Sequence, residues 1–100
     1  MVGTTNALDR IINTRATLAQ HNLNMTEACT LLYLLNNGKS VTGCVSKYIR
    51  VLPTSLSRVL GVLEASGKVV IAVNKEDRRS LIIDLTPEGT ALARKLEEQL

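Results

Sequence analysis

The chain has 100 residues, of which 45% are hydrophobic and 21% are charged, and its formal net charge is +3. A chain of this length builds one modest hydrophobic core, so we expect a single domain spanning residues 1–100. No apolar run approaches the roughly 18 residues of a membrane span, which predicts no membrane association. No secretory signal is visible at the start, so a cytoplasmic location is expected.

Apolar residues at helical spacing predict four helices before a hairpin. The first runs from about 5–20, and the second begins after Thr26 as its N-cap. A short extended piece leads into a third helix capped by Thr42, and Pro53 opens a fourth helix that runs to about Gly67. The expected buried faces consist of Ala28, Leu31, Leu32, Leu35, Val45, Ile49, Leu56, Val59, Leu60 and Leu63.

After the fourth helix the apolar pattern changes to alternation. Residues 69–73 (VVIAV) and 81–85 (LIIDL) are rich in β-branched residues, and the polar stretch 74–80 (NKEDRRS) separates them, which predicts a hairpin. A final helix, capped by Thr86, spans about 87–100. Two helices joined by a tight turn and followed by a hairpin predict a winged helix-turn-helix, mainly α with a small β-hairpin wing (α+β).

Basic residues concentrate in the middle of the chain. Residues 39–79 hold eight basic and three acidic residues, a net charge of +5, whereas the remaining residues carry −2. This distribution favours one surface that meets an anion such as nucleic acid. The absence of Phe and Trp argues against binding single strands through stacked bases, so double-stranded DNA is the expected partner.

The residues used in catalysis and metal binding are sparse. Cys29 and Cys44 lack metal-ligand spacing, and without an export signal we expect both thiols to be reduced and buried. His21 is the single histidine, and no glycine-rich phosphate loop or nucleophile–base set is present. The sequence therefore predicts a protein that is not an enzyme and that uses no metal or cofactor. Redox activity of the thiols and a small-molecule effector stay open.

Four segments together resemble the MarR family of bacterial and archaeal regulators. They are LNMTEACTLLYLL (23–35), SLSRVLGVLEASGKV (55–69), NKEDRRS (74–80) and IIDLTPEGTAL (82–92). Their order is specific, because a Ser/Thr-rich helix ending Leu-Glu-x-x-Gly is followed by a hairpin with Asp-x-Arg and then by Leu-Thr-x-x-Gly. Two departures stand out: Leu52 occupies a position where a Ser is common, and the sequence stops at Leu100 where family members continue with a long helix.

The fourth helix is the predicted recognition helix. At 100° per residue its outward side carries Thr54, Ser55, Arg58 and Val62, with Ser57 on the flank. Arg58 can chelate guanine O6 and N7, the hydroxyl groups can bond bases or phosphates, and Val62 can touch a thymine methyl. The alternative interpretation is an ordinary amphipathic surface helix.

The predicted wing tip carries Lys75, Asp77, Arg78 and Arg79. A narrow minor groove attracts arginine, so we expect one arginine to enter it while the other grips a flanking phosphate; which one enters is left open. The resemblance assigns the Asp-x-Arg pair to Asp77 and Arg79, with Asp77 orienting a guanidinium. A solvated charged turn is the alternative. Further candidate phosphate contacts are Lys47, Arg50, Lys68 and Lys75.

These features predict a sequence-specific double-stranded DNA-binding transcriptional regulator that acts as a homodimer on a pseudo-palindromic site. The terminal helices, about 5–20 and 87–100, are the expected dimerisation elements, because their apolar stripes exceed what one small core needs. Those stripes contain Leu8, Ile11, Ile12 and Leu18 at one end and Leu92, Leu96 and Leu100 at the other. Two alternatives remain: a winged-helix protein-interaction module that does not bind DNA, and a ligand-responsive switch.

Overall fold

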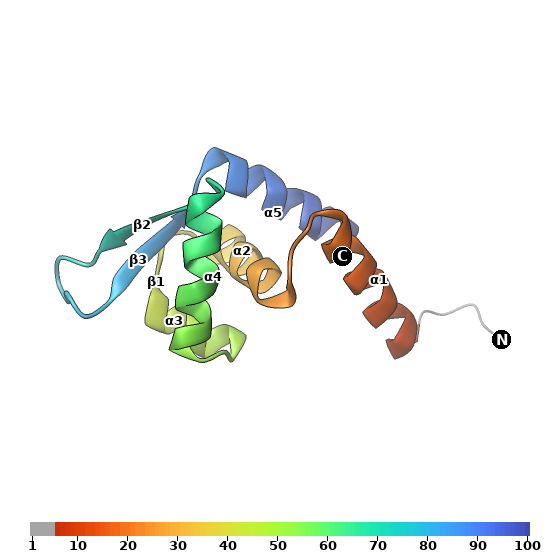
Figure 1. Cartoon of the computed structure of the whole chain (residues 1–100), viewed down its shortest axis with the longest axis horizontal. Coiled ribbons are helices and arrows are strands. Elements are labelled where there is room, and N and C mark those ends of the chain that lie inside the picture. The colour runs from red at the N-terminus through yellow and green to blue at the C-terminus, as the bar shows by residue number, and fades with distance from the viewer. Residues whose placement is uncertain (1–5) are drawn as a thin grey trace.

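Five helices and three short strands make up residues 6–100, which the computed structural model describes (Figure 1). In chain order they are α1 (Ala7–Gln20), α2 (Met25–Asn37), β1 (Ser40–Val41), α3 (Thr42–Ile49), α4 (Pro53–Ala65), β2 (Val69–Val73), β3 (Leu81–Leu85) and α5 (Pro87–Gln99). The predicted winged helix-turn-helix is confirmed, with α3 and α4 as the two-helix unit and β2 and β3 as the wing. The predicted start of the first helix at residue 5 lies outside the described residues.

The sheet is antiparallel, with the strand order β1-β3-β2. β3 pairs along its length with β2, from Leu85 opposite Val69 to Leu81 opposite Val73. Both strands have the predicted bounds, because β-branched residues favour the pleated strand and the polar tip interrupts them. The predicted extended piece before α3 is β1, whose two residues pair with the other edge of β3. The wing is thereby joined to the start of the helix-turn-helix.

The core centres on α2, which packs against α3, α4 and α5. The inward stripe of α4 is buried as predicted, and its apolar spacing explains why this side of the helix turns toward the core. Within residues 6–100 the buried apolar side chains are Leu18 from α1; Ala28, Leu31 and Leu34 from α2; Val45 from α3; Leu56, Val59, Leu60 and Leu63 from α4; Val69 and Ile83 from the sheet; and Ala93 and Leu96 from α5.

The predicted N-caps of α2 and α3 are wrong. Asn24, not Thr26, caps α2: the Glu27 N–H donates to its side-chain oxygen, and the Asn24 N–H donates to the Glu27 carboxylate, both at 2.8 Å. This reciprocal capping box satisfies two amides at once, which Thr26 alone could not do. Val41 precedes α3 in an extended conformation, because the helix starts directly at the end of β1 and so takes Thr42 into its first turn.

The start of α5 docks against the turn that precedes the wing. Thr86 caps this helix as predicted: its hydroxyl accepts the Gly89 N–H at 3.0 Å and donates to the Gly67 carbonyl at 2.6 Å. The Thr86 N–H also donates to the Lys68 carbonyl at 3.1 Å. A Cβ atom at Gly89 would overlap the Lys68 carbonyl oxygen and lie 2.9 Å from its carbon. The close approach of helix and turn therefore requires glycine at residue 89.

The prediction that both cysteines are buried is wrong. Cys44 is exposed, and Cys29 is only partly buried; both are free thiols. Cys44 points to solvent because the neighbouring Val45 takes the inward position of α3. Burial raises the pKa of the Cys29 thiol above its ordinary value, which lowers the fraction of reactive thiolate.

The terminal helices divide into buried and exposed parts. Leu18 and Leu96, both predicted for a dimer surface, lie in the chain's own core. In contrast, Leu8, Ile11, Ile12 and Leu100 are exposed, and α1 lies at the end of the molecule opposite the wing (Figure 1). The apolar surface that the two terminal helices offer to another chain is therefore smaller than predicted and lies mostly on α1. None of the helices in the described residues is long and apolar enough to cross a membrane.

Candidate nucleic-acid interface

The outward side of α4 combines small and polar residues with one arginine. The five residues predicted to meet DNA on this helix are all exposed: Thr54, Ser55, Ser57, Arg58 and Val62. A methyl group added at Gly61, between Arg58 and Val62 in the sequence, would meet no atom within 4 Å. Since nothing in the described chain covers this surface, it can approach the floor of a major groove closely.

The first turn of α4 has no side-chain cap. Leu52 stands at the N-cap position and provides no oxygen, and Pro53 occupies the first turn. Proline suits this position because its missing N–H would have no partner within the helix, and its φ is already helical. Thr54 does not replace the missing cap, since it lies inside the helix. The start of the helix therefore relies on Pro53.

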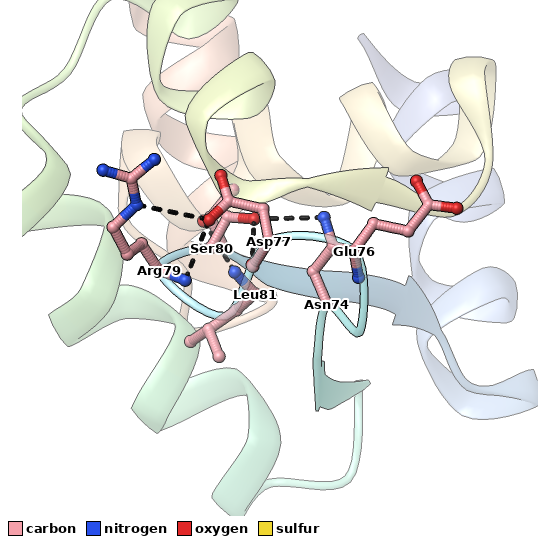
Figure 2. A network of polar contacts seen from close by, with 7 residues as sticks. Asn74, Glu76, Asp77, Arg79, Ser80 and Leu81 are labelled. Carbon is pink, nitrogen blue, oxygen red and sulfur yellow. Dashed lines mark hydrogen bonds and ion pairs between the residues drawn. The ribbon is translucent and has the colours of Figure 1, made fainter.

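The wing tip is closed by hydrogen bonds among its own residues (Figure 2). Asn74 and Ser80 stand at its two ends: the Asn74 side-chain amide donates to the Ser80 hydroxyl at 3.1 Å, and the Asn74 N–H donates to the Ser80 carbonyl at 3.2 Å. Between them, the Asp77 N–H donates to the Asn74 carbonyl and the Ser80 N–H to the Asp77 carbonyl. Neither Asn74 nor Ser80 was a predicted site residue, although Asn and Ser around a polar tip are typical of side-chain-closed turns.

The Asp77 carboxylate contacts both the backbone and the side chain of Arg79. Its Oδ1 accepts the Arg79 N–H at 3.1 Å and the Arg79 Nε–H at 3.4 Å. The ion pair is exposed and contributes little by itself. The backbone bond, however, forms a turn that sets the direction in which the Arg79 side chain leaves the tip. The described structure therefore pairs Asp77 with Arg79, the arginine that the Asp-x-Arg motif indicated.

One hollow of about 320 Å³ joins the wing to the helix-turn-helix. Its lining comes from α3 (Thr42, Gly43 and Ser46), from α4 (Pro53, Leu56, Ser57 and Leu60) and from the wing (Arg79, Ser80 and Leu81). The Leu81 N–H also donates to the Thr42 hydroxyl at 3.5 Å, which ties the base of the wing to α3. Ser57 and Arg79, which are 22 positions apart in the sequence, therefore face the same space.

The remaining basic candidates differ in their surroundings. Arg78, Lys47 and Lys75 are exposed, and Arg50 ends α3 in a left-handed conformation with φ 61°. Lys68 is half-buried, and its Nζ lies 3.3 Å from the Glu88 carboxylate at the start of α5. Lys68 is therefore paired with an acidic side chain, which makes it the least available of these candidates for a phosphate.

Comparisons with known proteins give a likeness in fold. No protein-family model matches the sequence, and no curated protein matches it. Among solved structures, NadR in complex with 4-hydroxyphenylacetate is 23% identical with a TM-score of 0.82, and the match covers 99% of this chain and 76% of that one. The S. aureus MepR–DNA complex is 22% identical with a TM-score of 0.75, covering 94% and 82%. AbfR bound to DNA is 23% identical with a TM-score of 0.79, covering 92% and 68%.

The described residues thus form a winged helix-turn-helix domain with a three-stranded wing sheet. Its fold is that of the MarR-type transcriptional regulators, which confirms the resemblance that the sequence motifs indicated. Of the three structures named above, those of MepR and AbfR hold DNA.

Proposed function

We propose that this protein is a sequence-specific double-stranded DNA-binding transcriptional regulator that acts as a homodimer on a pseudo-palindromic site. The observation that carries the proposal is the shared hollow in which Ser57, on the flank of the outward side of α4, faces the wing arginine Arg79. In this proposal α4 enters a major groove and reads base edges, while the wing reaches the neighbouring backbone and minor groove. The DNA-bound structures of this fold support it.

The character of the α4 surface favours DNA over a protein partner. A docking face for protein would be strongly apolar or acidic at its centre, whereas this one is centred on Arg58 among small hydroxyl residues. Small side chains let the helix backbone lie deep in the groove, and hydroxyl groups and arginine are the donors that bases and phosphates accept. We therefore assign base contact to Arg58 and Val62 and mixed base or phosphate contact to Thr54, Ser55 and Ser57.

Arg58→Ala is expected to weaken specific binding by about 1–3 kcal/mol and to relax base preference at one position of each half-site. The reason is that a guanidinium chelating guanine supplies both affinity and discrimination. Selection from a random duplex library, with wild type and variant in parallel, measures both effects. If wild type enriches no sequence, the proposed function fails; if the variant enriches an unchanged sequence, only the role of Arg58 fails.

Arg79→Ala is expected to weaken binding to most duplex sequences and to reduce the slope of log affinity against log salt by about one. A phosphate or minor-groove contact releases counterions, so losing one contact removes about one unit of slope. The same change is expected for Arg78→Ala if that side chain grips the flanking phosphate. A titration series over salt concentration measures the slope, and an unchanged slope in both variants would exclude the wing from DNA contact.

The same titrations test whether Asp77 strengthens or weakens DNA binding. Its carboxylate is close to where phosphates would lie, so simple electrostatics predicts tighter binding for Asp77→Ala, whereas its contacts to Arg79 predict weaker binding. Asp77→Asn is the matched control, since an amide oxygen keeps the bond to the Arg79 N–H but lacks the charge. Tighter binding by Asp77→Ala would contradict the orienting role.

The homodimer is supported by the apolar side of α1. Leu8 and Ile11 are 62% and 63% exposed, and in a soluble protein adjacent large apolar side chains of this kind usually find a partner surface. Packing the terminal helices of two chains around a two-fold axis would cover them. It would also set the two α4 helices about one DNA turn apart, roughly 34 Å.

A further inference from the structure

We propose that Asn74 and Ser80 form a clasp that holds the wing tip in its DNA-binding shape before DNA arrives. The clasp is the pair of hydrogen bonds by which the Asn74 side chain and N–H donate to the Ser80 hydroxyl and carbonyl. The inference rests on the proposed function and adds two uncharged positioning residues to it.

Both side chains of the clasp are used on their donor and their acceptor sides. Besides donating to Ser80, Asn74 accepts the Glu76 N–H on its side-chain oxygen at 3.1 Å. Besides accepting from Asn74, the Ser80 hydroxyl donates to the Asp77 carbonyl at 3.0 Å. Figure 2 shows the resulting network, in which the two ends of the tip and its middle are joined through two side chains. Asn74→Ala removes the bonds of the Asn74 side chain to the Ser80 hydroxyl and to the Glu76 N–H. Ser80→Ala removes the bonds of the Ser80 hydroxyl to the Asn74 side chain and to the Asp77 carbonyl.

The clasp acts on Arg79 through Asp77. The Asp77 carbonyl accepts from both the N–H and the hydroxyl of Ser80, while the Asp77 carboxylate accepts the Arg79 N–H. The backbone between residues 77 and 80 is therefore held at Ser80 by the clasp and at Asp77 by the turn that its carboxylate forms with the Arg79 N–H. Arg79 leaves this path toward the hollow that it shares with α4.

The hairpin does not need the clasp in order to pair. The ladder between β2 and β3 extends to the pair Val73 and Leu81, which are the residues directly before and after the tip. Asn74 and Ser80 therefore order the tip itself, and a tip without them would have to be ordered when DNA binds. Ordering several residues at that moment costs conformational entropy and lowers affinity.

The test uses the full chain, a duplex obtained by selection, and four variants. Asn74→Ala and Ser80→Ala each remove the shared Asn74–Ser80 side-chain bond and one further bond of the tip, so each is expected to weaken binding at least fivefold, the effect of about one lost neutral hydrogen bond or more. Because both changes remove the same Asn74–Ser80 side-chain bond, the loss in the double variant should be smaller than the product of the two single losses. No charge is removed, so the salt slope should stay at the wild-type value, unlike that of Arg79→Ala. Ser80→Thr keeps the hydroxyl and should bind like wild type.

Hydrogen exchange of the free protein measures how well the clasp orders the wing tip in the absence of DNA. The Asp77 and Ser80 amides, which are bonded within the tip, should exchange faster in both alanine variants than in wild type. Wild-type affinity in both single variants, or losses that multiply in the double variant, would overturn the inference. If wild type binds no duplex, the proposed function fails, whereas unchanged exchange in the variants removes the clasp whatever the protein binds.

Discussion

Gly89→Ala will lower the free energy of unfolding by about 3 kcal/mol, because it forces a methyl group into backbone atoms that cannot rotate away. The added carbon would overlap the Lys68 carbonyl oxygen, and the Leu85 side chain lies only 3.2 Å away on another side. Relief therefore requires α5 to move away from the turn. That movement would stretch the bonds by which Thr86 joins the helix to the Gly67 and Lys68 carbonyls.

A movement at the start of α5 reaches the core. Ala93 lies one helical turn beyond Gly89, and Leu96 follows; both are fully buried against the rest of the chain. Any shift of the helix axis opens gaps around these side chains, which adds a packing loss to the local overlap. The Leu-Thr-x-x-Gly motif thus has a physical basis here: Thr provides the cap, and Gly permits the docking.

Gly61→Ala is the matched control for this prediction. Gly61 is also helical, but a methyl group there meets no atom within 4 Å, so we expect a gain of about 0.5–1 kcal/mol from the better helix propensity of alanine. Urea denaturation followed by circular dichroism measures both variants. A free energy of unfolding for Gly89→Ala within about 0.5 kcal/mol of wild type would show that α5 accommodates the methyl group.

The sequence predicted those parts of the fold that local patterns determine. The bounds of β2 and β3 followed from alternating β-branched residues, and the buried side of α4 followed from its 3.6-residue period. The N-cap of α2 is also encoded locally, since Asn24 stands three residues before Glu27, and the prediction of Thr26 overlooks this spacing. The error shows that a capping box, in which two residues bond reciprocally, is a stronger signal than one favourable residue.

The candidate site was predictable in composition but not in arrangement. Periodicity placed Arg58 and its neighbours on the outside of α4, and the structure leaves them exposed. The Asp-x-Arg spacing indicated the pair of Asp77 and Arg79, but it did not indicate the bond between the Asn74 and Ser80 side chains, which closes the same seven-residue tip. The hollow between wing and helix likewise depends on the three-dimensional docking of distant segments.

Apolar stripes also do not reveal which chain covers them. Leu96 and Leu18 have the same helical spacing as their exposed neighbours, yet both are buried within one chain. An aspartate at Leu96, which is 0% exposed, would place a charge in the core and unfold the protein, so it cannot report on assembly. A test of the proposed dimer must use residues that are exposed in the single chain.

Leu8→Asp combined with Ile11→Asp is therefore expected to convert a homodimer into folded monomers. Both side chains lie on the exposed side of α1, so the substitutions cost the single chain little, while two aspartates per chain facing their symmetry mates would oppose association. Light scattering at micromolar concentration should give twice the chain mass of 10.9 kDa for wild type and the chain mass itself for the variant. A wild-type mass of one chain would contradict the dimer.

DNA affinity should fall with the dimer. Two linked half-site contacts become one, and the loss of the intramolecular second contact is expected to weaken binding about a hundredfold or more. Asn13→Asp with Gln20→Asp is the matched control, because both residues are exposed on the opposite side of α1 and the two substitutions add the same charge. If the control pair weakens binding equally, charge rather than assembly explains the loss. If only the Leu8 and Ile11 pair does so, α1 links the two DNA-reading helices.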